Sequence, residues 1–209
     1  MTTFTYKPIK IMKDIILNSL LKSYSYTQYR KIIADLLLEK KSTGDIQSED
    51  LTHYSSLNDI RMNRLDKTIT ITDENRQKLQ ALQKEYIWLV ISEGWCGDAA
   101  QLLPIFNKMA QYSEKVKLSI VFRDENPELM NLFLTNGGRS IPKLIIIDKA
   151  TMEVIANFGP RPSVAGAMIK NYKQLMGIID EKVKTDLQLW YLKDKGISTQ
   201  NEVLALLKE

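Results

Sequence analysis

The chain has 209 residues, of which 44% are hydrophobic and 26% are charged, and its net charge at pH 7 is +4. This composition is typical of a globular protein with a sizeable core, in one domain with extensions or in two small domains. The basic residues are interspersed with acidic ones, so we expect no nucleic-acid partner, and the absence of an apolar run of about 18 residues predicts no membrane span.

The first part of the chain, residues 11–66, is predicted to be helical. Apolar residues recur there at helical spacing. Thr27 is the expected N-cap of one helix that stops before Gly44, and the segment from Ser56 to Asp59 resembles a capping box that opens a helix over 57–65.

From Lys67 onward the pattern changes to an alternation of strands and helices. Residues 67–71 alternate between polar and apolar and predict a short edge strand. The further elements in chain order are a helix capped by Asp73 up to 85, a strand at 86–92, a helix at 98–112, a strand at 116–122, a helix from 126 to 137, strands at 144–147 and 154–158, and a helix from 163. Such alternation predicts an α/β sheet with parallel strand pairs.

The tail from residue 180 is again predicted to be helical. Gly196 is the expected stop of one helix, and the segment from Thr199 to Glu202 resembles a capping box for the last helix.

Few residues of this chain can bind metals or form disulfides. Cys96 is the only cysteine and His53 the only histidine. This excludes a disulfide within one chain and a Cys/His metal site, and we expect neither a metal nor a cofactor. The first residues lack a basic segment followed by an apolar one, so we expect no signal peptide and a cytoplasmic protein.

Three segments are predicted to form a site. Cys96 lies in the turn Trp95-Cys96-Gly97-Asp98 between a strand and a helix. The unpaired N–H groups and the positive dipole end of a helix N-terminus favour the thiolate, which is the nucleophilic form. Ile141-Pro142 comes directly before a strand, and a loop containing Arg161 follows the last strand. Asp98 is expected to cap the helix or to act on the thiol.

Residues 67–176 resemble the thioredoxin superfamily, on two motifs that stand in the right order. Trp95-Cys96-Gly97 matches the start of the family's Trp-Cys-Gly-Pro-Cys motif, and Asp124-Glu125-Asn126-Pro127 and Ile141-Pro142 follow at the family's spacing. The flanking helices suggest a bacterial subfamily with extensions. The resemblance implies that Cys96 is the attacking cysteine, that Trp95 and Gly97 shape its turn, and that Pro142 is the cis-proline beside which Ile141 binds an extended substrate.

The chain departs from the thioredoxin pattern where that family resolves mixed disulfides. Ala99 stands in place of the second cysteine, and Asp98 in place of the motif's proline. Val90 and Ile120 occupy the positions of the buried aspartate and lysine that assist the resolving step. The departures predict monothiol chemistry, in which an external thiol releases the adduct on Cys96. Arg161, with Arg123, Arg139 and Lys143, is expected near the sulfur, where it lowers the pKa of the thiol or binds a carboxylate.

We therefore expect a thioredoxin fold, with a central mixed sheet flanked by helices, over 67–179, a helical extension over 1–66 and another over 180–209. The favoured hypothesis is a monothiol oxidoreductase whose partner is a disulfide-bearing protein or a small thiol, and whose Cys96 alkylates faster than a free cysteine. One alternative is a redox-inactive module that binds a peptide or partner protein at the cis-proline edge. Another is a structural member of an assembly held by the flanking helices, and the oligomeric state stays open.

Overall fold

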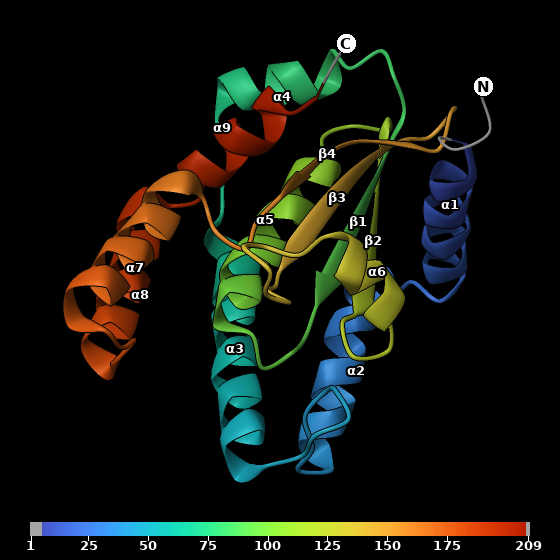
Figure 1. Ribbon diagram of the computed structural model, residues 1–209. Coiled ribbons are helices and arrows are strands. Elements are labelled where there is room, and N and C mark those ends of the chain that lie inside the picture. Colours follow the sequence, from blue (N-terminus) through green and yellow to red (C-terminus); the bar gives the residue numbers. More distant parts are fainter. Residues whose placement is uncertain (1–5, 208–209) are drawn as a thin grey trace.

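The computed structural model describes residues 6–207 (Figure 1). These residues form a central sheet with helices on both faces. The helices are α1 (Tyr6–Leu21), α2 (Tyr26–Leu38), α3 (Glu49–Thr68), α4 (Asp73–Gln80), α5 (Gly97–Ala110), α6 (Pro127–Leu132), α7 (Ser163–Met176), α8 (Glu181–Asp194) and α9 (Ile197–Ala205); the strands are β1 (Tyr86–Ser92), β2 (Val116–Phe122), β3 (Lys143–Asp148) and β4 (Glu153–Phe158). None of the helices in this part of the chain combines the length and the apolar composition that a membrane span needs.

The sheet has the strand order β2–β1–β3–β4. β1 is parallel to β2 and antiparallel to β3, and β3 is antiparallel to β4. Because β1 and β3 run in opposite directions, the end of β1 lies beside the beginning of β3, where Ile91 pairs with Lys143. The segments that follow β1 and precede β3 therefore meet at one end of the sheet. The expected α/β architecture, with a mixed sheet and extra helices at both ends, is confirmed.

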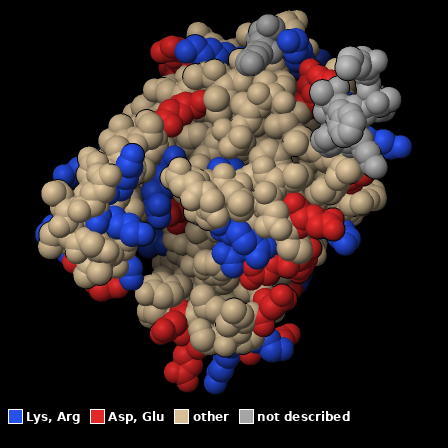
Figure 2. Space-filling view, in the orientation of Figure 1, with Lys and Arg blue, Asp and Glu red and all other residues tan. Residues whose placement is uncertain are grey.

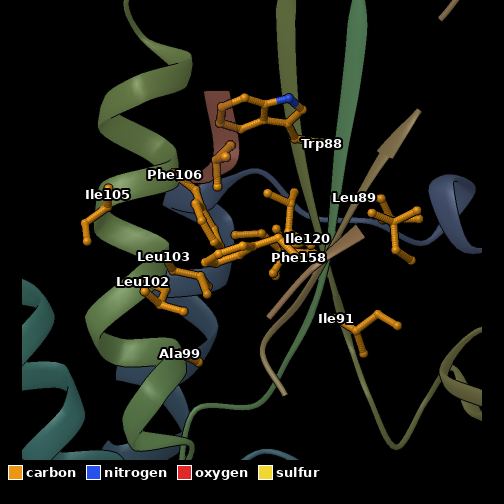
Figure 3. Close-up of a cluster of buried hydrophobic side chains, with 14 of the residues drawn as sticks. Trp88, Leu89, Ile91, Ala99, Leu102, Leu103, Ile105, Phe106, Ile120 and Phe158 are labelled. Atoms are coloured by element: carbon orange, nitrogen blue, oxygen red, sulfur yellow. The ribbon is translucent and has the colours of Figure 1, made fainter. Parts of the chain in front are cut away.

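Every residue of β1 is buried, as expected for a central strand that helices cover on both faces. On one face Trp88 contacts Phe106 of α5 with ring centroids 6.5 Å apart, and Phe106 contacts Phe158 of β4 at 6.0 Å. Leu89 and Ile91 point away from α5 on the other side of the strand (Figure 3). Successive side chains of a strand point to opposite faces, so Trp88 packs against α5 while Leu89 and Ile91 pack on the other face of the sheet.

The segment between α1 and α2 covers the free edge of β2. Tyr24 and Ile120 exchange two backbone hydrogen bonds of 2.8 Å, and Tyr29 of α2 stacks on Phe122 with ring centroids 5.6 Å apart. An edge strand with unpaired N–H and C=O groups invites pairing with other chains, and this contact removes part of that edge.

In the part of the chain before β1, two predicted helix starts and one predicted strand are wrong. α3 begins after the N-cap Ser48, whose side chain accepts a hydrogen bond from Leu51 N–H, so Ser56 lies inside the helix. The same helix continues to Thr68, and residues 67–71 form no strand. α2 likewise begins two residues before the predicted cap Thr27, at a capping box of Ser25 and Gln28. The predicted domain boundary at 66/67 falls within α3 and stays a prediction.

The C-terminal helices pack against the sheet domain in two places. α7 and α8 form a hairpin that lies at the left of Figure 1, next to α3, whereas α9 packs against α4 and α5. α9 begins after Gly196, so the predicted capping box at Thr199 is also wrong. Gly196 has a φ of +81°, and a Cβ there would lie 2.7 Å from Ile105 Cδ1, so glycine is needed at this turn.

Candidate functional site

Cys96 is the N-cap residue of α5, in the turn that follows β1. Its backbone is extended, and its Sγ accepts a hydrogen bond from Ala99 N–H at 3.5 Å. The Sγ–H in turn donates to the carbonyl oxygen of Ile141 at 3.3 Å. The thiol therefore lies where the end of β1 and the beginning of β3 meet.

The Ile141–Pro142 peptide bond beside the thiol is cis. Pro142 precedes Lys143, the first residue of β3, and Gly159 approaches it closely, since a Cβ on Gly159 would lie 2.3 Å from Pro142 O. The structure thus brings Cys96, Ile141 and Pro142 together, three of the residues singled out in the sequence.

Burial, and after it the negative charge of Asp98, raise the pKa of the Cys96 thiol to about 12. The N–H groups of Ala99 and Asp98 and the charge of Arg161 act in the opposite direction. The residue is only 8% exposed. The N–H groups of the helix N-terminus lower this pKa as expected, but the expected net activation of the thiol is not found, because the loss of hydration outweighs two hydrogen bonds and a helix dipole.

Asp98 is buried and shared between two partners. Arg161 donates from Nε to Oδ1 at 3.0 Å and approaches Oδ2 with Nη2 at 2.5 Å, and the Tyr191 hydroxyl donates to Oδ1 at 2.9 Å. Burial raises the pKa of Asp98, and attraction to Arg161 opposes this. No side-chain oxygen of Asp98 caps α5, where Cys96 is the acceptor. Asp98 instead connects the thiol turn to the loop after β4 and to α8.

Trp95 is half-buried and its ring carries a cation on one face. The guanidinium of Arg123 lies 4.8 Å from the ring centroid and is paired with Asp124 at 2.8 Å. A Cβ on Gly44 would lie 2.7 Å from Asp124 Oδ2 and 3.6 Å from Trp95 Nε1. Arg123 therefore positions Trp95.

Two of the other basic residues expected near the sulfur have different surroundings. Lys143 is buried, and its Nζ donates to Thr135 Oγ1 at 2.7 Å and to Gly159 O at 3.2 Å. Arg139 is exposed. Arg161 is the basic residue of this set whose charge lowers the pKa of Cys96.

Glu93, three residues before Cys96, is a buried carboxyl that the sequence reasoning missed. Asp124 N–H donates to its Oε1 at 3.0 Å, while Oε2 is buried without a partner in the structure. Burial raises the pKa of Glu93 to about 7. A glutamate directly after an apolar strand is the signal that would have indicated it.

Val90 and Ile120 stand where the thioredoxin pattern has a buried aspartate and a lysine. They pair across β1 and β2 and are fully buried, so both positions are apolar in this protein.

Tyr29 of α2 and Tyr191 of α8 contact the residues around the thiol, a feature for which the sequence carries no signal. Burial raises the pKa of each hydroxyl; a negative charge on Cys96 raises that of Tyr29 further, and the charge of Asp98, followed by that of Cys96, raises that of Tyr191. Tyr29 also shares a hydrogen bond of 3.0 Å with Ser92 at the end of β1. Helices outside the segment that resembles thioredoxin thus contribute to the surroundings of Cys96.

Comparisons with known proteins agree with this geometry. A sequence model of the family described as Thioredoxin matches residues 44–173. Thioredoxin 1 of Synechococcus elongatus is 33% identical over 79 residues, which are 37% of this chain and 71% of that protein. The thioredoxin of Buchnera aphidicola is 28% identical over 121 residues, which are 57% of this chain and all of that protein.

Two solved structures share the fold. A Pseudomonas aeruginosa protein of unknown function has a TM-score of 0.56 at 15% identity and covers 72% of this chain and 84% of its own. An HIV epitope scaffold has a TM-score of 0.52 at 16% identity, with 88% and 97% covered. The family match spans more than half of the chain and includes the Cys96 turn and Pro142. The chain therefore belongs to the thioredoxin family, and this membership supports a general thiol–disulfide oxidoreductase type of function.

Proposed function

We propose that this protein exchanges disulfides through one thiol, that of Cys96, and that an external thiol completes the reaction. The observation that carries the proposal is the 3.3 Å contact between Cys96 Sγ and the carbonyl oxygen of Ile141, next to the cis bond of Pro142. This contact places the only sulfur nucleophile of the chain against a backbone edge that an extended substrate can join.

The structure corresponds to the resting protein, in which Cys96 is a protonated thiol. Cys96 donates its S–H to Ile141 O, an interaction that only the thiol can make. With a pKa of about 12, on the order of one molecule in 10⁵ carries a thiolate at pH 7. Activation therefore requires a change around the sulfur.

Substrate binding supplies that change in our proposal. A peptide strand that pairs with Ile141 offers its own N–H to the carbonyl and takes the acceptor away from the thiol. Of the influences that remain, the N–H groups of Ala99 and Asp98 and the charge of Arg161 lower the pKa of Cys96, against the charge of Asp98. Binding of the strand and loss of the thiol proton to solvent then favour each other.

The exchange proceeds in two steps. The Cys96 thiolate attacks one sulfur of the substrate disulfide, so that a bond to Cys96 forms while the substrate bond breaks, and the departing thiolate takes up a proton. An external thiolate then attacks the mixed disulfide and releases Cys96, leaving a new disulfide between the substrate sulfur and the external thiol. The chain itself has no second cysteine for this step.

The proposal is tested by mixing the reduced protein with glutathione disulfide, quenching with acid and measuring the intact mass. We expect one glutathionyl adduct per chain, its removal by added thiol, and no adduct on Cys96→Ser. The same protein unfolded in urea is the control, which shows that glutathione disulfide modifies Cys96 once the thiol is accessible. A folded protein that stays unmodified while the unfolded chain reacts would contradict the proposal.

A further inference from the structure

A cavity of about 500 Å³ lies between α3 and α8, beside the thiol turn. It reaches Trp95, Gly97 and Asp98, the residues on either side of Cys96. Its volume is within the range of sites that bind small molecules. α3 and α8 are the two helices that stand side by side at the lower left of the molecule (Figure 1).

One part of the cavity wall is apolar. Tyr54 and Leu57 on α3 are 44% and 43% exposed. Further apolar or aromatic lining comes from Leu51, Trp95 and Leu187. A ligand with an apolar or aromatic portion would cover these side chains.

One of the cationic side chains that line the cavity has no carboxylate within ion-pair distance in the described part of the chain. The cations are Arg61, Arg161 and Lys184, and the anions are Asp98 and Glu181. Asp98 is paired with Arg161 at 2.5 Å and Glu181 with Lys184 at 2.6 Å. Arg61 forms no ion pair within residues 6–207. In Figure 2, lysine and arginine side chains (blue) lie where the α7–α8 hairpin meets the body of the molecule.

Arg61 is held in place beside the thiol turn. Its Nη1 donates to Asn58 Oδ1, and the buried Asn58 donates from Nδ2 to the carbonyl of Gly94 at 3.0 Å. A Cβ on Gly97 would lie 3.9 Å from Arg61 Nη1. Burial lowers the pKa of Arg61 and the charge of Arg64 lowers it further, whereas the charge of Asp98, which is paired with Arg161, acts in the opposite direction. An anion in the cavity would favour the guanidinium and accept its remaining N–H groups.

We infer that this cavity binds a low-molecular-weight thiol or disulfide that carries a carboxylate. The carboxylate binds Arg61, and the apolar portion lies against Trp95 and Leu57, beside the turn that holds Cys96. The carboxylate site follows from the cavity and its charges alone, whereas the thiol or disulfide character of the ligand rests on the proposed function. α8 lies beyond the segment that matches the thioredoxin family, so this site is built in part from the extension.

The binding test uses the full-length Cys96→Ser protein, which cannot react. Two aromatic disulfides serve as probes: dithiobis(nitrobenzoate), which carries carboxylates, and dithiodipyridine, which is neutral. Their dissociation constants are measured by calorimetry. We expect the anionic probe to bind more tightly, and Arg61→Gln to weaken it about tenfold, the effect of one charge-assisted hydrogen-bond pair.

Three variants make the comparison specific. Arg64→Gln removes an equal charge one turn further along α3, where the side chain lines a different cavity. Because exposed charges are screened, this variant should change the dissociation constant of the anionic probe less than about twofold. Arg61→Lys should retain part of the affinity. Neither glutamine variant should alter the binding of dithiodipyridine, and thermal unfolding checks that each variant is folded.

The outcomes separate the two proposals. Equal weakening by Arg61→Gln and Arg64→Gln, or no preference for the anionic probe, or no binding of it, would overturn the carboxylate site. Failure of the wild-type thiol to react with glutathione disulfide would overturn the proposed exchange and leave the binding result standing. Selective loss of the anionic probe on Arg61→Gln would support the site.

Discussion

The hydroxyl of Tyr191 in α8 donates a hydrogen bond of 2.9 Å to Asp98 Oδ1, in the turn that holds Cys96. The two residues are 93 positions apart in the sequence. With Arg161 on the same carboxylate, this contact ties the C-terminal hairpin to the thiol turn. The surroundings of the thiol therefore depend on a helix outside the part of the chain that matches the thioredoxin family.

Tyr191→Phe removes this hydrogen bond and leaves the ring in place. We expect a loss of about 1–2 kcal/mol in the free energy of unfolding, because a buried carboxylate loses one of its donors. Urea denaturation measures the change. Tyr172→Phe is the matched control, since it removes a tyrosine–aspartate bond on the surface of the same hairpin, and its effect should be smaller. Equal effects of the two variants would contradict the structural role of Tyr191.

Asp98→Asn preserves the shape of the side chain and removes its charge. Because Arg161 then loses its buried partner, we expect a loss of about 3 kcal/mol in stability. The same change should lower the pKa of Cys96, whose second-largest raising influence is the charge of Asp98. Iodoacetamide should therefore alkylate the variant faster than the wild type at any one pH below 9.

Arg161→Gln is the opposite test of this electrostatic coupling. It removes a charge that lowers the pKa of Cys96, so alkylation at fixed pH should become slower. Both rates are read by intact mass on protein that circular dichroism shows to be folded. Rates that move in the same direction in the two variants would show that access, and not charge, controls the thiol.

The pH profile of alkylation reports the ionisation of Cys96 directly. A thiol with a pKa of about 12 should react about tenfold faster for each pH unit from roughly 6 to 9, without a plateau. It should also react more slowly at neutral pH than the urea-unfolded chain, the reverse of what the sequence suggested. A plateau of the folded protein below pH 9 would contradict the structure.

Glu93 should make stability depend on pH. Its pKa is raised by burial from an ordinary value of 4.5 to about 7. The folded state therefore holds this proton more tightly than the unfolded state, so the contribution of Glu93 to stability falls as pH rises from about 4.5 to 7 and stays low above it. The total change is about 3 kcal/mol for a shift of this size.

Glu93→Gln cannot ionise and should lack this decrease. The measurement is the difference in unfolding free energy between wild type and Glu93→Gln at a series of pH values. Aspartates and glutamates elsewhere titrate equally in both proteins and cancel in the difference. A difference that does not vary between pH 4.5 and 7 would contradict a raised pKa for Glu93.

The sequence by itself determined the strands and their order of alternation with helices. The apolar run over 86–92 predicted β1 residue for residue, because a strand buried on both faces needs an uninterrupted apolar segment. The alternation at 67–71 misled, because Lys67 and Thr68 end a helix that begins at a cap 20 residues earlier, and residues 69–71 are non-helical but pair with no strand. The meeting of Cys96 with Ile141 followed from the family resemblance.

Only the tertiary structure decided the state of the thiol. The helix N-terminus at Cys96 is a local feature and was visible in the sequence, and it favours the thiolate. Burial is not local: Tyr29 of α2 shares a hydrogen bond with Ser92 at the end of β1, and Tyr191 of α8 donates one to Asp98 in the thiol turn. Removing a charge from water has a larger effect than a partial dipole, so distant segments, brought together by folding, set the protonation of Cys96.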